Sequence, residues 1–244
     1  MRLAAMQPYF LPYLGYFALI KHTDRWVVNG IVQFRKHSWI NRNRILSPVK
    51  GWNYMTIPLK KHSSHDRIAD ITIHNQQQWK TKIQAQLQHY KKIAPHYNHV
   101  MELVSNILSL QTSSLMEMDI HSLTLVCQYL DISFQPVLFS DLDINTSNIQ
   151  SPDQWGLETA MALGADEYWN LPGGESFYHP EKYEQNGIKL RFLRVKLKEY
   201  DQHRSPFEPA LSIIDVMMFN SNSKIHHMLD DYQLETISHE PQAK

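Results

Sequence analysis

A short run of basic, amide and aromatic side chains has the composition of an anion-binding site. Residues 37–44 read HSWINRNR, so two arginines alternate with two asparagines beside a tryptophan and a histidine. Arginine is well suited to bidentate contact with phosphate or carboxylate, and an indole offers a flat face to a sugar ring or a base. The candidate binding residues are Trp39, Asn41, Arg42, Asn43 and Arg44. His37 is a candidate general acid or base. A solvated loop with ordinary surface charges is the alternative interpretation.

The first residues of the chain predict a strand that opens into a loop and then a helix. The apolar run LAAM at 3–6 ends at Gln7-Pro8, where proline removes a backbone donor and fixes φ. Pro12 suits the first turn of the helix. Ligands of α/β proteins bind where strand ends open into such loops. The candidate residues are Gln7 and Tyr9, which would orient a substrate, and Gly15, which would permit close backbone approach. The alternative is a structural turn packed by aromatic side chains.

Paired glycines mark a second loop of this kind. The segment YWN at 168–170 predicts a strand end, and LPGGESFY follows at 171–178. Ser176 would cap the next helix, whose N-terminus would attract an anion. The candidate binding residues are Gly173, Gly174 and Tyr178. A plain turn followed by a capped helix explains the same residues.

A third group of candidates lies near the end of the chain, at 200–215. His203 and Asp215 would form an acid–base pair if the fold brings them together. The spacing of Ser212 and Asp215 also matches a helix N-cap with its acidic partner, and that interpretation needs no long-range geometry.

Metal and thiol chemistry have little support. The single cysteine, Cys127, lies in the apolar pattern LTLVCQYL, so it is expected to be a small buried hydrophobe, and a disulfide within the chain is excluded. His62 and His65 are three residues apart, but no third ligand follows at the spacing of a known metal site. We therefore predict no metal and no cofactor.

The composition is that of an ordinary globular protein. Of 244 residues, 43% are hydrophobic, and 24 Lys and Arg balance 24 Asp and Glu. Net neutrality and the lack of a recognised module argue against nucleic-acid binding. No run approaches the roughly 20 apolar residues of a membrane span, and the N-terminus lacks the apolar core of a signal peptide. A cytoplasmic location is expected, and the oligomeric state stays open.

Strand-like and helix-like patterns alternate along the chain, on either side of a helical middle. We divide it into an N-terminal part of an α/β domain at 1–75, a helical insertion at 76–130 and the C-terminal part of the α/β domain at 131–244. Beyond the first strand, the predicted strands lie at 25–34, 52–60, 68–74, 134–139, 165–170 and 188–197. The predicted fold class is therefore α/β, with a largely parallel sheet flanked by helices, Rossmann-like or nucleotidyltransferase-like.

Several of these segments together resemble the WbqC-like family. The matching motifs are MQPYFLPYLGYFALI at 6–20, QFRKHSWINRNRIL at 33–46, LGADEYWNLPGGESFY at 163–178 and YDQHRSPFEPALSIIDVMMFN at 200–220. The resemblance spans residues 1 to about 220. It implies a bacterial cytoplasmic protein of surface-polysaccharide or O-antigen biosynthesis, with acyl- or aminoacyl-type transfer as its reaction. The family usually has acidic residues just before the arginine run, where this chain has Asn29-Gly30.

Two functional hypotheses follow. The first is a transferase that acts on a nucleotide sugar or a similar small anionic substrate, with the arginines on the anion and His37 or His203 as general acid or base. The second is a non-catalytic ligand-binding or scaffolding protein of the same pathway. Asn29, the absence of a glycine-rich phosphate loop and the absence of histidine between Met1 and Ile20 favour the second hypothesis.

Overall fold

The centre of the protein is a mostly parallel six-stranded β-sheet. It is seen in a computed structural model that describes residues 1–237, and its strand order is β5-β2-β1-β6-β7-β8. The first five strands in this order run parallel, and β8 pairs antiparallel with β7. The sheet strands are β1 (Arg2–Met6), β2 (Arg25–Val28), β5 (Pro136–Leu138), β6 (Glu167–Asn170), β7 (Lys189–Val195) and β8 (Tyr232–Glu235). The predicted α/β fold class is confirmed.

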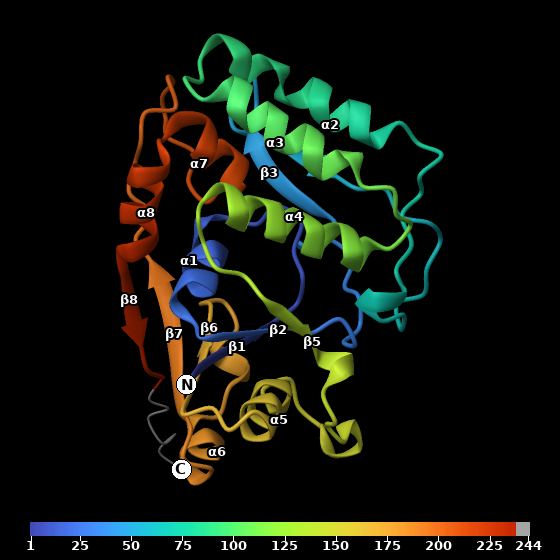
Figure 1. The fold of residues 1–244 in the computed structure, drawn as a ribbon, viewed down its shortest axis with the longest axis vertical. Coiled ribbons are helices and arrows are strands. Elements are labelled where there is room, and N and C mark those ends of the chain that lie inside the picture. Colours follow the sequence, from blue (N-terminus) through green and yellow to red (C-terminus); the bar gives the residue numbers. More distant parts are fainter. Residues whose placement is uncertain (238–244) are drawn as a thin grey trace, which may run out of the picture.

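Alternating side chains of the central strands build a core on each face of the sheet. Ala4 and Val28 belong to a large apolar cluster with α1 (Leu14–His22), whereas Leu3 and Val27 belong to a second cluster with α5 (Gln154–Ala162). Strands buried on both faces are typical of parallel sheets covered by helices. Figure 1 shows α5 and α6 (Pro180–Gln185) on one side of the sheet and α1 on the other.

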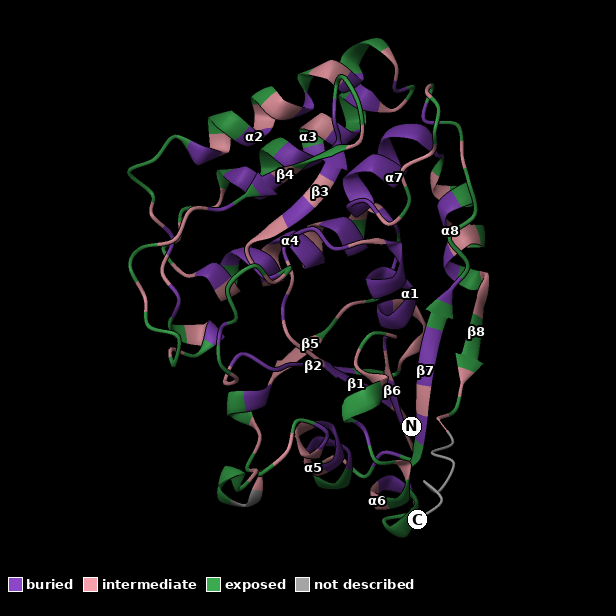
Figure 2. Cartoon of the chain, turned by 180° about the vertical axis from the view of Figure 1, so that it is seen from behind, coloured by how far each residue is buried: buried purple, intermediate pink, exposed green. Residues whose placement is uncertain are grey.

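A second layer is inserted between β2 and β5. It contains an antiparallel hairpin and three helices that pack around it (Figure 1). These elements are β3 (Arg42–Leu46), β4 (Trp52–Thr56), α2 (Trp79–Leu87), α3 (Tyr97–Ser109) and α4 (Leu115–Tyr129). From the C-terminal part of the chain, α7 (Ile213–Phe219) packs against β3 and α3, and α8 (Asn222–Asp230) packs against α1. Figure 2 shows α1 and α7 buried along most of their length.

Two strands, β3 and β8, have no counterpart among the predicted strands, and the strands expected at 25–34 and 52–60 end earlier, at Val28 and Thr56. The strand expected at 68–74 is wrong: η1 (Ile68–Asp70) is a 3-10 turn, and only isolated bridges follow, with Thr72 and Ile73 paired to different segments. The helix expected at 176–185 is interrupted, because η5 ends at Phe177 and α6 begins at Pro180. The other 3-10 segments are η2 (Gln88–Lys92), η3 (Phe139–Asp141) and η4 (Thr146–Asn148).

The structure of residues 1–237 bears on three expectations, which concern the cysteine, metal sites and membrane-spanning helices. Cys127 is buried with 1% of its surface exposed, and burial raises the pKa of its thiol, so the small-hydrophobe interpretation is confirmed. Within residues 1–237, no cluster of three or more His, Cys, Asp or Glu side chains has metal-site geometry. In the same range, no helix is both long and apolar enough to cross a bilayer.

Candidate functional site

The strand order reverses direction between β1 and β6. From β1 the chain proceeds to β2 on one side, whereas β6 continues to β7 on the other, so the crevice rule for open α/β sheets points to the carboxyl ends of these two strands. Leu3 lies opposite Tyr168 in the parallel register, so the two loops that follow Met6 and Asn170 leave from the same edge. These are the opening loop (residues 7–13) and the glycine loop (residues 171–178).

The opening loop is held in place by aromatic packing and backbone hydrogen bonds. The Tyr16 hydroxyl donates to the Gln7 carbonyl over 2.7 Å, and the Tyr9 ring lies 5.5 Å from the Tyr16 ring. The side chains of Gln7 and Tyr9 are half-buried. A Cβ on Gly15 would lie 2.5 Å from the Tyr13 hydroxyl oxygen, so Gly15 allows the close approach of Tyr13.

The arginine run is joined directly to the opening loop. The Phe10 amide donates to the carbonyls of Trp39 and Ile40, both at 3.2 Å, and the Asn43 side-chain amide donates to the Phe10 carbonyl at 3.2 Å. Asn41 donates to the Ile57 carbonyl at 2.9 Å. Asn43 therefore holds the opening loop to the hairpin, and Asn41 connects the two ends of the hairpin.

The two arginines lie among aromatic rings. Arg42 lies 4.2 Å from the centroid of the Tyr54 ring, and Arg44 lies 5.5 Å from Trp39 and 5.2 Å from Trp52. Arg44 and Tyr54 are paired in the hairpin register, so alternate residues of β3 and β4 build this face. We call this group of two arginines and three aromatic residues the arginine–aromatic platform.

The charge of the platform is not neutralised by carboxylates. Arg42 donates to the His37 carbonyl at 2.6 Å and Arg44 donates to the Ala210 carbonyl at 3.0 Å, but neither pairs with an acid among residues 1–237. In the same range, neither Nε–H finds an acceptor. Trp39 is 39% exposed and Trp52 38%. A cationic group stacked on accessible rings can bind an anion and a flat ring side by side.

Residues 200–215 connect α7 to the rest of the protein through buried hydrogen bonds. Asp215 is fully buried and accepts hydrogen bonds from Tyr90, Tyr200 and Gln202. Burial raises the pKa of Asp215 although these three donors and the charge of Arg204 act in the opposite direction. The Ser212 hydroxyl accepts from the Ile214 amide, which confirms the N-cap, but the reciprocal bond to Asp215 is not formed, because the Ser212 amide donates to the Arg44 carbonyl instead.

The acid–base pair considered for His203 and Asp215 is not formed. His203 lies 3.4 Å from Asp201 with 51% of its side chain exposed, whereas the carboxylate of Asp215 is occupied by its three donors. Asp215 therefore serves the packing of α7. His37 is exposed and adopts a left-handed backbone with φ of 64°.

The glycine loop carries its own network. Gly173 has φ of 109° and its amide donates to Glu175 at 2.6 Å, and Glu175 accepts in turn from Arg194 at 3.1 Å. Tyr178 is buried and accepts from the Asn170 side-chain amide. Burial raises the pKa of Tyr178, and the charge that Tyr9 would carry on ionisation adds to the shift. The opening and glycine loops leave the same edge of the sheet, since β1 and β6 are paired.

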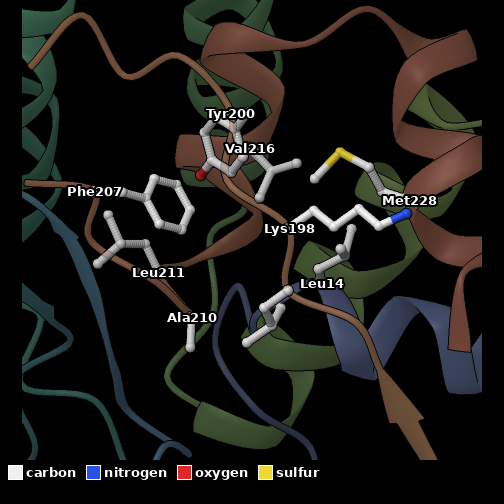
Figure 3. Close-up of a pocket in the computed structure, with 9 residues that line it drawn as sticks. Leu14, Lys198, Tyr200, Phe207, Ala210, Leu211, Val216 and Met228 are labelled. Carbon is white, nitrogen blue, oxygen red and sulfur yellow. The ribbon is translucent and has the colours of Figure 1, made fainter. Parts of the chain in front are cut away.

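Two cavities lie elsewhere. The first, of about 10 Å³, is an apolar gap among Leu14, Tyr200, Phe207, Val216 and Met228 (Figure 3), and it has room for about one water molecule. The second, of about 400 Å³, lies at the amino edge of the sheet between residues 20–26 and 131–135. Neither includes a predicted site residue.

Sequence reasoning missed two buried acids. Asp153 accepts hydrogen bonds from Ser151, His179 and Lys182, which connect α5 to α6. Asp119 in α4 is also fully buried, yet neither of its carboxyl oxygens has a hydrogen-bond partner among residues 1–237. A signal existed for Asp119, because it falls at helical spacing on the apolar stripe that contains Leu115 and Val126.

The fold and the loops at its switch point define an α/β protein with a Rossmann-like sheet and an inserted layer. A family model described as the WbqC-like protein family matches residues 7–227, so the chain belongs to the WbqC-like family. It is also similar to "Uncharacterized protein Rv1507c" of Mycobacterium tuberculosis (strain ATCC 25618 / H37Rv), with 27% identity over 222 residues that cover 90% of this chain and 93% of the relative. No solved structure matches the chain significantly.

Proposed function

We propose that this protein is a transferase of surface-polysaccharide biosynthesis that binds a nucleotide sugar, or a similar anionic substrate, at the carboxyl edge of its sheet. The observation that carries the proposal is the arginine–aromatic platform, whose guanidinium groups have no carboxylate partner among residues 1–237. Through Phe10, the platform is hydrogen-bonded to the loop that leaves the switch point. Fixed cations of this kind bind a pyrophosphate and stabilise the charge that develops on it.

The roles follow from the placement of each group. Arg42 and Arg44 would hold the anion, and Trp39 would stack on a base or a sugar ring. Gln7 and Tyr9 from the opening loop, with Gly173 and Gly174 from the glycine loop, would orient the remainder of the substrate. Asn41 and Asn43 act indirectly, since the Asn43 amide fixes the platform to the opening loop and the Asn41 amide connects the two ends of the hairpin.

The proposed reaction is transfer of an acyl or aminoacyl group to the sugar. The attacking hydroxyl or amine forms a bond to the acyl carbon and gives up a proton, while the leaving group departs with the electron pair of its own bond. His37 is the candidate base, because its carbonyl is bound by Arg42 and it lies next to the platform.

The second candidate function is a non-catalytic sugar-nucleotide-binding protein of the same pathway. The observation in its favour is that Asp215 is occupied by three donors and has no contact with His203. Multiple turnover of a candidate donor by the purified protein would exclude this alternative.

The experiment is calorimetric titration of the wild type with UDP-glucose. Arg42→Ala and Arg44→Ala should each weaken binding about tenfold or more, which corresponds to about 1.4 kcal/mol. Arg67→Ala is the matched control, because Arg67 is exposed and its charge is already paired with Asp70. Melting temperatures report whether each variant is folded. Unchanged binding by both platform variants would contradict the proposal.

A further inference from the structure

Asp119 differs from the other buried acids of the protein. Asp153 and Asp215 are equally buried, but each accepts hydrogen bonds from three side chains. Asp119 has 0% of its surface exposed, and both of its oxygens lack a donor among residues 1–237. Buried polar groups in folded proteins are nearly always hydrogen-bonded, so an exception calls for a physical explanation.

The topology places Asp119 at the carboxyl edge of the sheet. The chain leaves α4 at Tyr129 and enters β5 at its amino end, so the first turns of α4 lie toward the opposite, carboxyl edge. A contact agrees with this: a Cβ on Gly30, just beyond β2, would lie 2.3 Å from the sulfur of Met116. Met116 is one turn before Asp119, so both lie near the strand end.

Asp119 is also close to the opening loop. Its charge contributes to the raised pKa of Tyr16, after burial and the charge of Tyr9. The Tyr16 hydroxyl donates to the Gln7 carbonyl. Tyr9 packs on Tyr16, while the next residue, Phe10, bonds to the arginine run. The opening loop thus bonds to the arginine run through Phe10 and packs on Tyr16, whose pKa responds to the charge of Asp119.

The surroundings limit what Asp119 can recognise. A phosphate would lose its hydration among apolar side chains and, within residues 1–237, would find no cation there in return. A metal ion lacks ligands, because no cluster of three His, Cys, Asp or Glu is found among the described residues. A hydroxyl or amino group of an uncharged ring fits best, because it can donate to a carboxyl oxygen without bringing a second negative charge.

We propose that Asp119 is a substrate-recognition residue that hydrogen-bonds a hydroxyl or amino group of the sugar ring, which enters between the opening loop and the first turns of α4. The inference rests on the proposed function and deepens it: the platform binds the diphosphate, and Asp119 distinguishes a sugar-bearing ligand from the bare nucleotide. Gln7, Tyr9 and Met116, all half-buried, are the side chains that would border the entrance.

The test compares UDP-glucose with UDP in calorimetric titrations. Asp119→Leu keeps the branching of the side chain and removes both oxygens, and Asp119→Asn keeps the size and shape and removes the acid, so one of them remains informative if the other does not fold. Met118→Leu is the matched control, a volume-conserving change at a buried position of the same helix.

We expect Asp119→Leu to bind UDP-glucose about tenfold more weakly or worse, and Asp119→Asn about threefold or worse, with binding of UDP unchanged in both. The proposal about Asp119 is overturned if both variants bind UDP-glucose like the wild type, or if they lose UDP and UDP-glucose equally. A wild-type protein that binds neither ligand would overturn the proposed function and this inference together.

Discussion

The hydroxyl of Ser212 donates a 2.7 Å hydrogen bond to the carbonyl of Leu11, which lies 201 residues earlier in the chain. Two backbone bonds accompany it: the Ser212 amide donates to the Arg44 carbonyl and the Ile213 amide to the Pro12 carbonyl, both at 2.8 Å. These three bonds link the opening loop, the β3–β4 hairpin and the start of α7 to one another. They hold the platform in place relative to the opening loop.

Ser212→Ala should destabilise the protein by about 2 kcal/mol, because it removes a helix cap and leaves the buried Leu11 carbonyl without its donor. Urea unfolding measures the change. The control is Ser221→Ala, which removes an exposed cap of α8 and should cost about 0.5–1 kcal/mol. Equal losses in the two variants would show that the Leu11 bond contributes nothing.

Asp153 predicts one pH dependence of stability. Burial alone would raise the pKa of Asp153, but hydrogen bonds from Ser151, His179 and Lys182 outweigh it and lower the pKa to about 2. The unfolded chain then binds the proton more tightly, so this stabilisation is complete above pH ~4 and is lost as the pH falls toward 2. It amounts to about 2 kcal/mol. Asp153→Asn should therefore be less stable than the wild type at pH 7, with the gap closing on acidification. A gap that stays constant with pH would contradict this.

The pKa shift of Asp119 predicts a pH dependence of stability opposite to that of Asp153. Burial raises the pKa of Asp119 well above its usual value, so the folded state binds the proton more tightly than the unfolded state. Stability from this group is present below pH ~4 and decreases as the pH rises toward the folded-state pKa. Asp119→Asn does not ionise, so its stability relative to the wild type should increase between pH 4 and 7. Thermal unfolding across that range measures it, and parallel curves for the two proteins would refute the shift.

Gly156→Ala separates helix propensity from packing. Propensity alone would stabilise α5 by about 1 kcal/mol. The added Cβ would lie 2.4 Å from the ring of Tyr168, which is fully buried and donates to the Ala5 carbonyl. Overpacking of this kind costs about 1–3 kcal/mol, so net destabilisation is expected in urea. Gly174→Ala is the control, because the nearest atom would lie at 3.7 Å. A more stable Gly156→Ala variant would contradict the packing argument.

Local patterns predict the five parallel strands of the sheet but not its antiparallel edge strand β8, whose four residues YQLE carry no apolar run. The breaks at Pro8 and before Pro172 fall where β1 and β6 end, because proline acts on the backbone wherever it occurs, whereas the strand predicted at 25–34 ends already at Val28, before Asn29-Gly30. The strand prediction for 68–74 failed because the structure of this segment depends on distant partners. Its apolar alternation is that of a strand, but its backbone partners come from two separate segments, which no local pattern records.

The candidate site was predictable in composition and only partly in arrangement. The residue types of 37–44 indicated anion binding, but they did not show that Asn41 and Asn43 would donate to the backbone and that the arginines would stack on Trp52 and Tyr54. Partners far apart in the chain decide such contacts. Asp119 was missed because its neighbours made the helix look like ordinary core.

The most direct test of the account is hydrogen exchange of the wild type with and without UDP-glucose. A ligand at the carboxyl edge should slow exchange together in residues 7–13, 39–46 and 171–178, because the first two segments are hydrogen-bonded to each other and the third leaves the same edge of the sheet. Protection confined to residues 20–26 and 131–135, around the cavity of about 400 Å³ at the amino edge, would contradict it.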